Sequence, residues 1–240
     1  MWRAVVVTLT PEIFPGPLGV SVTGRAQERS LWSLDTVDLR AHGIGKHRAV
    51  DDTPAGGGAG MVMRADVVAA AVDAGLSRLG ALAPETPRLC LSPRGVPFTQ
   101  AMARELAEGP GALLVCGRFE GIDERAIEAR GLKQVSIGDY VLSGGEIAAM
   151  AVLDATLRHV PGVLGAAASL DEETFSGGLL EYPQYTRPRT FEGRDIPDVL
   201  IAGDHARVSE WRLAQQRALT RARRPDLLTF SEIDNESETE

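Results

Sequence analysis

The chain has 240 residues, 44% of them hydrophobic, which is enough for one large domain or two modest ones. Its formal net charge is −8, but the last ten residues carry five acids and no base, and without them the charge is −3. We expect this acidic tail to be disordered, and local basic segments still allow an RNA partner. The sequence has neither a signal-peptide pattern nor an apolar run of spanning length, which predicts a cytoplasmic protein without a membrane anchor.

The first half of the chain alternates between apolar runs and helical patterns. Strands are predicted at residues 4–9, 34–39, 88–91, 112–116 and 132–137. One helix is predicted over residues 66–74, with Asp66 as its N-cap and Gly75 as its stop. Another begins after the N-cap Thr99 and ends near Glu108. This order of elements predicts an α/β fold with a parallel sheet.

The chain has two cysteines, and each lies inside one of the apolar runs. We therefore expect Cys90 and Cys116 to be buried, reduced thiols. Their positions support neither a disulfide nor a metal site.

Three successive strands end in loops that contain glycine. These loops are residues 92–95, 117–121 and 136–145. In an open α/β sheet, ligands bind at the carboxyl ends of the strands. None of the loops matches the dinucleotide or Walker fingerprints, so NAD and ATP are poor candidates.

The last of these loops reads Ser-Ile-Gly-Asp-Tyr-Val-Leu-Ser-Gly-Gly-Glu over residues 136–146. Three glycines in eight positions let a backbone approach a ligand closely, and Tyr140, Val141 and Leu142 supply apolar walls. Because the loop has no Lys or Arg, it suits a flat, uncharged ring such as adenine better than a phosphate. Glycine content alone leaves a tight strand-to-helix connection without a ligand as an equal alternative.

A second unusual loop lies nearer the N-terminus. His47 and Arg48 precede the paired acids Asp51 and Asp52, and four glycines follow within residues 56–60. A surface linker would also contain glycine, but a basic pair beside paired aspartates favours a functional loop.

The helical pattern over residues 145–160 is apolar on more than one face, and Pro161 and Gly162 end it. A helix of this kind is buried in a large core or against a partner subunit. The small residues that follow are interpreted as an interdomain linker at 165–175, which divides the chain into domains at 1–164 and 176–240.

A last long helix is predicted from the N-cap Asp204 to Ala222. Its apolar positions form one stripe, and Arg217, Arg221 and Arg224 form another. An arginine stripe is often only a solvated face. Further arginines and the segment rich in Tyr and Arg at 181–189 favour RNA binding instead.

Several motifs resemble the bacterial tRNA (guanine-N1)-methyltransferase family, TrmD. The resemblance runs from Trp2 to about Leu228 and includes the loop at 136–146. The other matching motifs are Val-Thr-Gly-Arg-Ala at 22–26, Gly-Gly-Gly-Ala-Gly-Met at 56–61, Gly-Arg-Phe-Glu-Gly-Ile-Asp-Glu-Arg at 117–125, Pro-Gly-Val-Leu-Gly at 161–165 and Tyr-Thr-Arg-Pro at 185–188.

The resemblance implies a homodimer of the SPOUT class, with a parallel sheet, a trefoil knot and a small helical C-terminal domain. It implies methyl transfer from S-adenosylmethionine to N1 of guanosine 37 in tRNA, with a guanosine before it. A magnesium dependence is associated with the family, and the sequence contains no ligand cluster for that ion. Two alternatives stay open: a SPOUT methyltransferase for another RNA site, and a non-catalytic RNA-binding relative.

The resemblance also assigns residues. Glu120 would lie at the methionine end of the cofactor and Glu181 near its amine. With tRNA as the substrate, we expect the arginine stripe of the last helix, Arg217, Arg221 and Arg224, to bind it. The adenosine pocket would consist of Ser92, Pro93, Gly95, Gly117, Ser136, Ile137, Gly138, Tyr140, Leu142, Gly144 and Gly145.

Guanine N1 carries a proton at neutral pH, so the reaction needs a base, and the negative charge that develops on O6 needs a cation. The resemblance gives these roles to Glu173 and Arg158. The sequence departs from the family pattern at both acids, where Glu173 and Glu181 replace aspartates. Asp171 and Glu172 are therefore competitors for the role of base.

Overall fold

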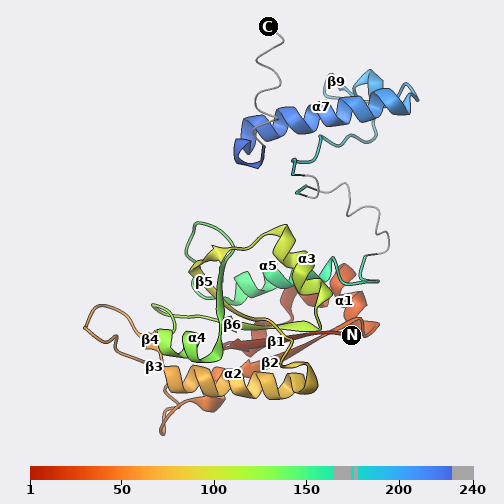
Figure 1. The fold of residues 1–240 in the computed structure, drawn as a ribbon. Coiled ribbons are helices and arrows are strands. Elements are labelled where there is room, and N and C mark those ends of the chain that lie inside the picture. The colour runs from red at the N-terminus through yellow and green to blue at the C-terminus, as the bar shows by residue number, and fades with distance from the viewer. Residues whose placement is uncertain (165–173, 176–177, 229–240) are drawn as a thin grey trace. The chain divides into compact units, whose positions relative to one another are not determined.

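The structure is a computed structural model that describes residues 1–164, 174–175 and 178–228. The chain divides into two compact units, residues 1–165 and 166–240, and each is described by itself (Figure 1). The predicted linker lies almost entirely outside the described residues, so the domain boundaries stay a prediction.

The first unit is built on a parallel five-stranded sheet, which confirms the predicted α/β fold. The strand order is β2-β1-β6-β5-β7, and every neighbouring pair is parallel. The strands are β1 Trp2–Thr8, β2 Trp32–Asp38, β5 Arg88–Pro97, β6 Gly111–Cys116 and β7 Lys133–Ser136.

Helices cover both faces of this sheet (Figure 1). One face carries α2 Ala65–Leu79 and α4 Glu124–Arg130. The other carries α1 Ser21–Glu28, α3 Gln100–Glu108 and α5 Glu146–Leu157. Short 3-10 turns lie at Pro11–Ile13, Gly16–Gly19, Leu39–His42, Gly80–Leu82, Asp198–Leu200 and Pro225–Leu227.

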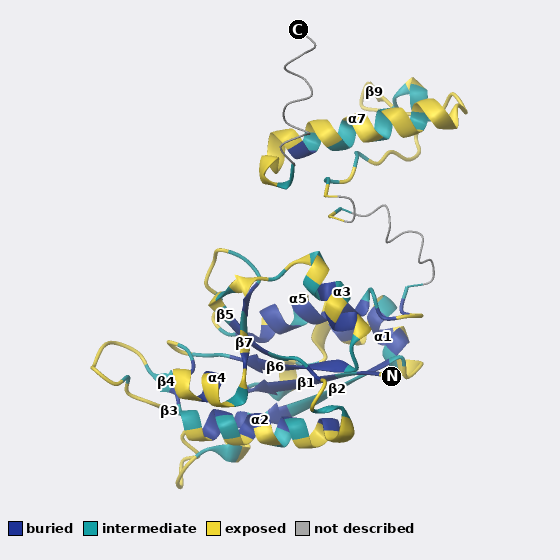
Figure 2. Cartoon of the chain, viewed as in Figure 1, coloured by how far each residue is buried: buried dark blue, intermediate teal, exposed yellow. Residues whose placement is uncertain are grey.

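Alternating strand residues divide the core into two clusters. Val5 and Val7 of β1 pack towards α2, whereas Ala4 and Val6 pack towards α5. Both sets are fully buried, which explains why β1 is a continuous apolar run instead of an alternating one. Figure 2 shows β1, β6 and the sheet side of the helices as buried.

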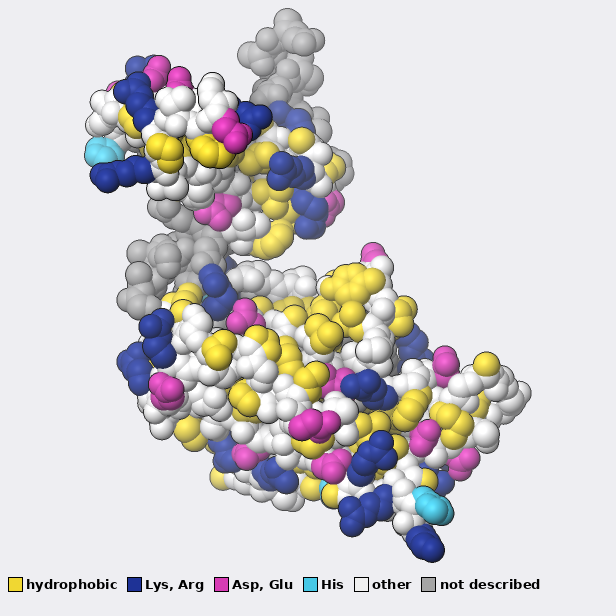
Figure 3. All heavy atoms as spheres, turned by 180° about the vertical axis from the view of Figure 1, so that it is seen from behind, with side chains coloured by type: hydrophobic (Ala, Val, Ile, Leu, Met, Phe, Trp, Pro, Cys, Tyr) yellow, Lys and Arg dark blue, Asp and Glu magenta, His cyan; other side chains and the backbone are white. Residues whose placement is uncertain are grey.

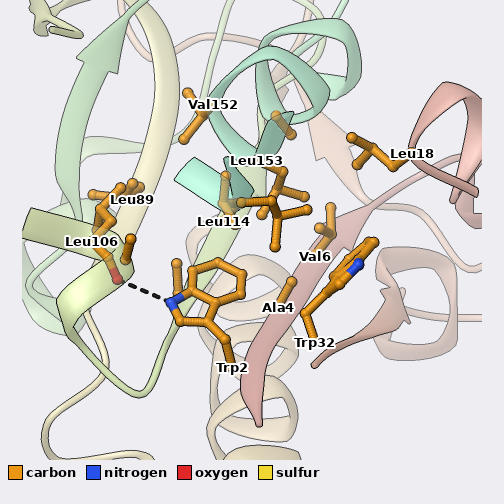
Figure 4. Packing of buried hydrophobic residues seen from close by; sticks show 14 of the residues in the cluster. Trp2, Ala4, Val6, Leu18, Trp32, Leu89, Leu106, Leu114, Val152 and Leu153 are labelled. Atoms are coloured by element: carbon orange, nitrogen blue, oxygen red, sulfur yellow. Dashed lines mark hydrogen bonds between the residues drawn. The ribbon is translucent and has the colours of Figure 1, made fainter. Parts of the chain in front are cut away.

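Two tryptophans pack in the cluster beneath α5 (Figure 4), and both indole N–H groups donate hydrogen bonds. Trp2 Nε1 donates to the Leu106 carbonyl at 2.9 Å, and Trp32 Nε1 donates to the Thr23 carbonyl at 2.8 Å. The rings fill the core without leaving a buried donor unsatisfied.

The structure corrects the prediction for α2. Gly75 does not stop the helix, which continues to Leu79 and ends at Gly80 with φ +59°. A Cβ at Gly75 would lie 2.8 Å from Leu113 Cδ1, so this glycine lets the helix pack closely on the sheet. Asp66 lies in the first turn, after Arg64 at the N-cap position. Its carboxylate accepts from Arg64, which lowers the pKa of Asp66.

The strand β5 also runs further than predicted. It continues through residues 92–95 to Pro97, with a register shift between Leu91 and Val96 against β7. Gly95 permits this path, because a Cβ there would lie 2.2 Å from the Val135 backbone nitrogen. The expected loop is therefore a bulge within a longer strand.

Other predicted elements are confirmed. The strand β2 begins two residues earlier than predicted, and β6 agrees to within one residue. Thr99 caps α3 by accepting from the Met102 backbone nitrogen at 3.3 Å. Both cysteines are buried free thiols. Burial raises the pKa of Cys90 to about 12 and that of Cys116 well above its usual value.

The second unit contains a hairpin of β8 Thr190–Phe191 and β9 Arg194–Asp195, and the helix α7 His205–Arg223. Asp204 caps α7 as predicted, accepting from Ala206 N and Arg207 N. Within the described part of the chain, no helix is both long enough and apolar enough to span a membrane.

Candidate functional site

A cavity of about 270 Å³ opens at the carboxyl ends of β5, β6 and β7. The three predicted glycine-containing loops supply most of its lining. Its volume is close to the lower end of the roughly 300–1,000 Å³ common for small-ligand sites. The cavity therefore lies where an open α/β sheet binds its ligand.

Most residues predicted to hold the cofactor line this cavity. They are Ser92, Pro93, Gly117, Glu120, Ser136, Ile137, Gly138, Tyr140, Leu142, Gly144 and Gly145. Gly95 is absent from the lining, because its backbone instead passes against β7. The structure thus brings together residues from three separate segments, while their contacts with a ligand stay a prediction.

The loop after β7 is shaped by its own polar groups. Ser136 Oγ donates to the Gly138 carbonyl at 3.0 Å, and the Gly138 nitrogen donates back to Ser136 Oγ at 3.3 Å. Tyr140 OH donates to the Ile137 carbonyl at 3.3 Å, which folds the ring over the loop. Tyr140 and Val141 are 54% and 83% exposed, so this apolar wall faces solvent on one side.

An ion pair that the sequence analysis did not identify lies beneath this loop. Glu146 is 2% exposed, and its Oε2 lies 3.0 Å from Arg118 Nη2. Its Oε1 accepts from Thr8 Oγ1 at 2.8 Å and from Thr10 Oγ1 at 3.2 Å. A buried carboxylate needs such partners, and these join the ends of β1 and β6 to the start of α5.

The Gly144-Gly145 pair is explained by packing within the protein. A Cβ at Gly144 would lie 2.4 Å from Arg118 Nε, and one at Gly145 would lie 2.7 Å from Cys116 Cα. The Gly145 nitrogen also donates to the Gly117 carbonyl at 2.9 Å. Part of the glycine content that suggested a ligand therefore lets the loop pack against β6 and the ion pair.

The glycine loop at 56–60 reaches the rim of the same cavity. It connects β3 Asp51–Asp52 to β4 Val62–Met63, an antiparallel pair. The Glu120 nitrogen donates to the Met61 carbonyl at 3.0 Å, and the Met63 nitrogen donates to the Gly121 carbonyl at 2.9 Å. A Cβ at Gly60 would lie 2.4 Å from Glu120 Oε1, so this loop packs directly on the predicted methionine-end residue.

The cations on the cavity wall are already paired. Arg118 is bonded to Glu146, and Arg94 Nη2 lies 3.1 Å from Glu124 Oε2. Paired guanidinium groups do not form a phosphate cradle, which agrees with an uncharged ring as the ligand. The described residues contain no group of three or more His, Cys, Asp or Glu arranged to hold a metal ion.

The remaining predicted residues lie elsewhere. Arg158 is the C-cap residue of α5, whose N-cap residue Gly145 lines the cavity, and the twelve helical residues between them span about 18 Å. It therefore lies at the far end of α5 from its own chain's cavity. Glu181 belongs to the second unit, where its Oε1 accepts from Gln184 Nε2 at 2.8 Å. Glu173 falls outside the described residues.

The predicted tRNA-binding arginines do not share one helix face. Arg217 and Arg221 are exposed on α7, but the helix ends at Arg223. Arg224 has a non-helical backbone and a 2.7 Å ion pair with Asp226, which lowers the pKa of that carboxyl. The predicted stripe is therefore wrong in its third member, because the chain turns before Arg224.

The fold and the cavity define an α/β protein with a parallel sheet and a cavity at the carboxyl ends of its strands. The family model described as tRNA (Guanine-1)-methyltransferase TrmD matches residues 2–230. The chain therefore belongs to the tRNA (guanine-1)-methyltransferase TrmD family.

Three similar curated proteins each carry the name tRNA (guanine-N(1)-)-methyltransferase. The one from Rhodopseudomonas palustris is 65% identical over 226 residues, covering 94% of this chain and 89% of the relative. That from Nitrobacter hamburgensis is 62% identical over 229 residues, with coverages of 95% and 94%. That from Nitrobacter winogradskyi is 60% identical over 237 residues, with coverages of 99% and 97%.

Proposed function

We propose that this chain transfers a methyl group from S-adenosylmethionine to N1 of guanosine 37 in tRNA, preferring a guanosine at the preceding position. Family membership supports tRNA guanine-N1 methylation and the methyl donor. The observation that carries the proposal is the cavity, because three segments distant in sequence converge there with the residues expected to hold the cofactor.

The cavity suits the adenosine part of the donor. Its loops present backbone amides and carbonyls beside the apolar side chains of Ile137, Tyr140 and Leu142. Both arginines on its wall are paired with carboxylates, which disfavours a phosphate. When bound, the sulfonium of S-adenosylmethionine supplies an activated methyl group.

The protein's part in the reaction is to move a proton and to stabilise charge. We assign removal of the guanine N1 proton to Glu173 and stabilisation of the charge on O6 to Arg158. Glu181 is proposed to lie near the cofactor amine. A magnesium requirement belongs to the same proposal, and its ligands would have to come from the substrate, the donor or residues beyond those described.

We propose a homodimer, and the position of Arg158 supports it. Because about 18 Å of helix separates Arg158 from its own chain's cavity, a second copy would have to supply it if it acts there. Ile147 on α5 and Val20 are 55% and 62% exposed, which provides apolar surface on the same side of the sheet. Sedimentation of a monomer at micromolar concentrations in an active preparation would contradict this proposal.

The trefoil knot is proposed for the segment that contains β5, β6 and β7. The chain passes from β5 to β6 on one side and then to β7 on the other, and the loop after β7 bonds to the loop after β6. Such crossings bring the loops close enough for one segment to pass through another. Strand order by itself does not require this threading. An experimental backbone trace without threading would overturn the knot.

We also propose that the protein acts in the cytoplasm, where its tRNA substrate is found. A labelled methyl-transfer assay tests the function with two transcripts that differ only at position 37, guanosine or adenosine. Transfer to the first alone, recovered as 1-methylguanosine, is expected. Equal transfer to both would favour another RNA site, and transfer to neither would favour a non-catalytic RNA-binding protein.

A further inference from the structure

A hairpin of the first unit, residues 43–49, carries a local positive charge between flanking acids, Asp38 on one side and Asp51 and Asp52 on the other. Residues 39–50 contain no acidic side chain, although the whole chain has a net charge of −8. Their basic and titratable side chains are Arg40, His42, Lys46, His47 and Arg48. Lys, Arg and His side chains gather on this projection of the first unit in Figure 3.

The backbone presents these side chains at the tip of a tight turn. Ile44 and Ala49 exchange two backbone hydrogen bonds of 2.9 Å, and the Arg48 nitrogen donates to the Gly45 carbonyl at 3.2 Å. Gly45 and Arg48 have left-handed backbones, with φ of +70° and +49°. The turn is therefore defined by the backbone, and Lys46, His47 and Arg48 all project into solvent.

Within the described part of the chain, these charges have no partner. Among the described residues, no ion pair or side-chain hydrogen bond involves Lys46, His47 or Arg48. The nearby Asp52 lies 3.2 Å from Arg64, which also binds Asp66 at 2.8 Å. Asp52 is thus already bound by another arginine, and among the described residues no ion pair joins the hairpin charges to the flanking Asp38 or Asp51.

The hairpin is joined to the rim of the cavity. Two residues after Ala49, β3 begins, and its partner β4 bonds to the loop that contains Glu120 and Gly121. In Figure 1 the hairpin projects below β3 and β4, at the same end of the sheet as the cavity. A nucleic acid that places one of its bases at the cavity end of the sheet would extend past the cationic side chains of the hairpin.

We infer that the basic hairpin, residues 43–49, binds backbone phosphates of the tRNA substrate through Lys46 and Arg48. The inference rests on the proposed function, because it takes tRNA as the polyanion. Phosphate contacts by Lys and Arg position a nucleic acid without reading its sequence. Each contact releases counterions, so its removal lowers the dependence of binding on salt.

The test compares two double variants of equal charge change. Lys46→Gln/Arg48→Gln removes the hairpin charges. The control Arg29→Gln/Lys133→Gln removes one Arg and one Lys near the amino ends of the strands, where Arg29 precedes β2 and Lys133 begins β7. Fluorescence anisotropy with a labelled tRNA transcript measures affinity at several salt concentrations, and calorimetry measures S-adenosylmethionine affinity.

The hairpin variant should bind tRNA more weakly, with the slope of log affinity against log salt reduced by about 1.4–1.8. Its S-adenosylmethionine affinity should match the parent, and the control should keep the parent slope. The inference is overturned if the hairpin variant keeps the parent slope. It is also overturned if the slope falls equally in the control variant. The two proposals can fail separately. If the hairpin variant lowers the salt slope of tRNA binding but the parent transfers no methyl group, the proposed function fails and the hairpin contact stands.

Discussion

Glu146 shows at the scale of single residues how the candidate site is held together. Its carboxylate joins hydroxyls at and just after the end of β1, a guanidinium that follows β6 and the first turn of α5. The helix N-terminus favours a negative charge at this position. Because the loop with Gly144 lies directly on the ion pair, the shape of the cavity depends on a charge that lies outside the proposed chemistry.

Removing Arg118 should destabilise the protein, because the buried Glu146 carboxylate loses its cationic partner. Arg118→Met leaves Glu146 with hydroxyl partners only, and we expect a loss of roughly 2–4 kcal/mol in the free energy of unfolding. The value falls below that of a wholly buried pair, because the Arg118 side chain is 27% exposed. Urea denaturation measures it. The double variant Arg118→Met/Glu146→Met should regain part of the loss, and a double variant less stable than the single one would contradict this explanation.

The proposed base also belongs to the residue scale. Glu173→Gln keeps the shape of the side chain but removes its basicity, so single-turnover methyl transfer should fall by roughly 10²–10⁴-fold. Glu173→Asp should retain substantial activity, because the carboxylate is kept. Asp171→Asn and Glu172→Gln are matched controls. If either control abolishes transfer while Glu173→Gln proceeds at the parent rate, the base is a neighbouring acid.

At the scale of elements, hydrophobic patterning predicted the sheet well. The apolar runs around Val6, Cys90 and Leu114 became buried parallel strands, because both faces of the sheet are covered and every residue position favours an apolar side chain. Strand ends with glycine also indicated where the cavity lies.

Long-range packing could not be predicted in this way. Gly75 and Gly95 look like stop signals in sequence, yet each permits a close approach to a strand that is distant along the chain. The Arg118–Glu146 pair joins residues 28 positions apart, and only a Glu directly after two glycines hinted at it. Such contacts depend on the tertiary fold, which local propensity does not encode.

Gly75 gives a direct test of this distinction. A glycine that merely weakens the helix would make Gly75→Ala stabilising by about 1 kcal/mol. Because the new methyl group would lie 2.8 Å from the Leu113 side chain, we expect Gly75→Ala to destabilise the protein by about 1–3 kcal/mol in thermal or urea unfolding. Ala70→Gly, on the exposed side of α2, calibrates the effect of helix propensity alone. If Gly75→Ala is more stable than the parent, α2 and the sheet can accommodate a methyl group at this position, and this explanation is wrong.

The arginines of α7 are a second prediction at this scale. Arg217→Gln/Arg221→Gln should weaken tRNA binding and lower its salt slope by about 1.4–1.8, leaving S-adenosylmethionine affinity intact. Arg224→Gln should change the slope less, because this guanidinium is already bound to Asp226. Anisotropy titrations with tRNA at several salt concentrations measure the slopes of the parent, the double variant and Arg224→Gln. A parent-like slope in the double variant would make that face of α7 an ordinary solvated surface.

At the scale of the whole molecule, the two units differ in how they are stabilised. The first has apolar clusters on both sides of a parallel sheet. In the described part of the second, Thr220 alone is buried, with its hydroxyl accepting from the Leu180 nitrogen at 2.9 Å. Aromatic contacts of Tyr185 with Trp211 and of Tyr182 with Arg212 supplement this small core. The acidic net charge is compatible with tRNA binding, because basic segments occur in both units.

The central claim is that the cavity at the ends of β5, β6 and β7 holds S-adenosylmethionine, and calorimetric titration of the cofactor tests it most directly. Gly144→Val is a poor probe, because its side chain would collide with the Arg118–Glu146 pair. Gly117 is better, because the atoms nearest to a Cβ there are the Leu91 carbonyl oxygen at 3.6 Å and the Ile122 side chain at 3.9 Å, which are ordinary contacts.

Gly109→Val provides the matched control, because Gly109 is outside the cavity lining and a Cβ there meets only the Leu106 carbonyl at 3.5 Å. We predict that the parent and Gly109→Val bind S-adenosylmethionine alike. Gly117→Val, folded by circular dichroism, should bind it more than tenfold less tightly, a loss above about 1.4 kcal/mol. Equal affinity in folded Gly117→Val, or no binding by the parent, would contradict the assignment of this cavity.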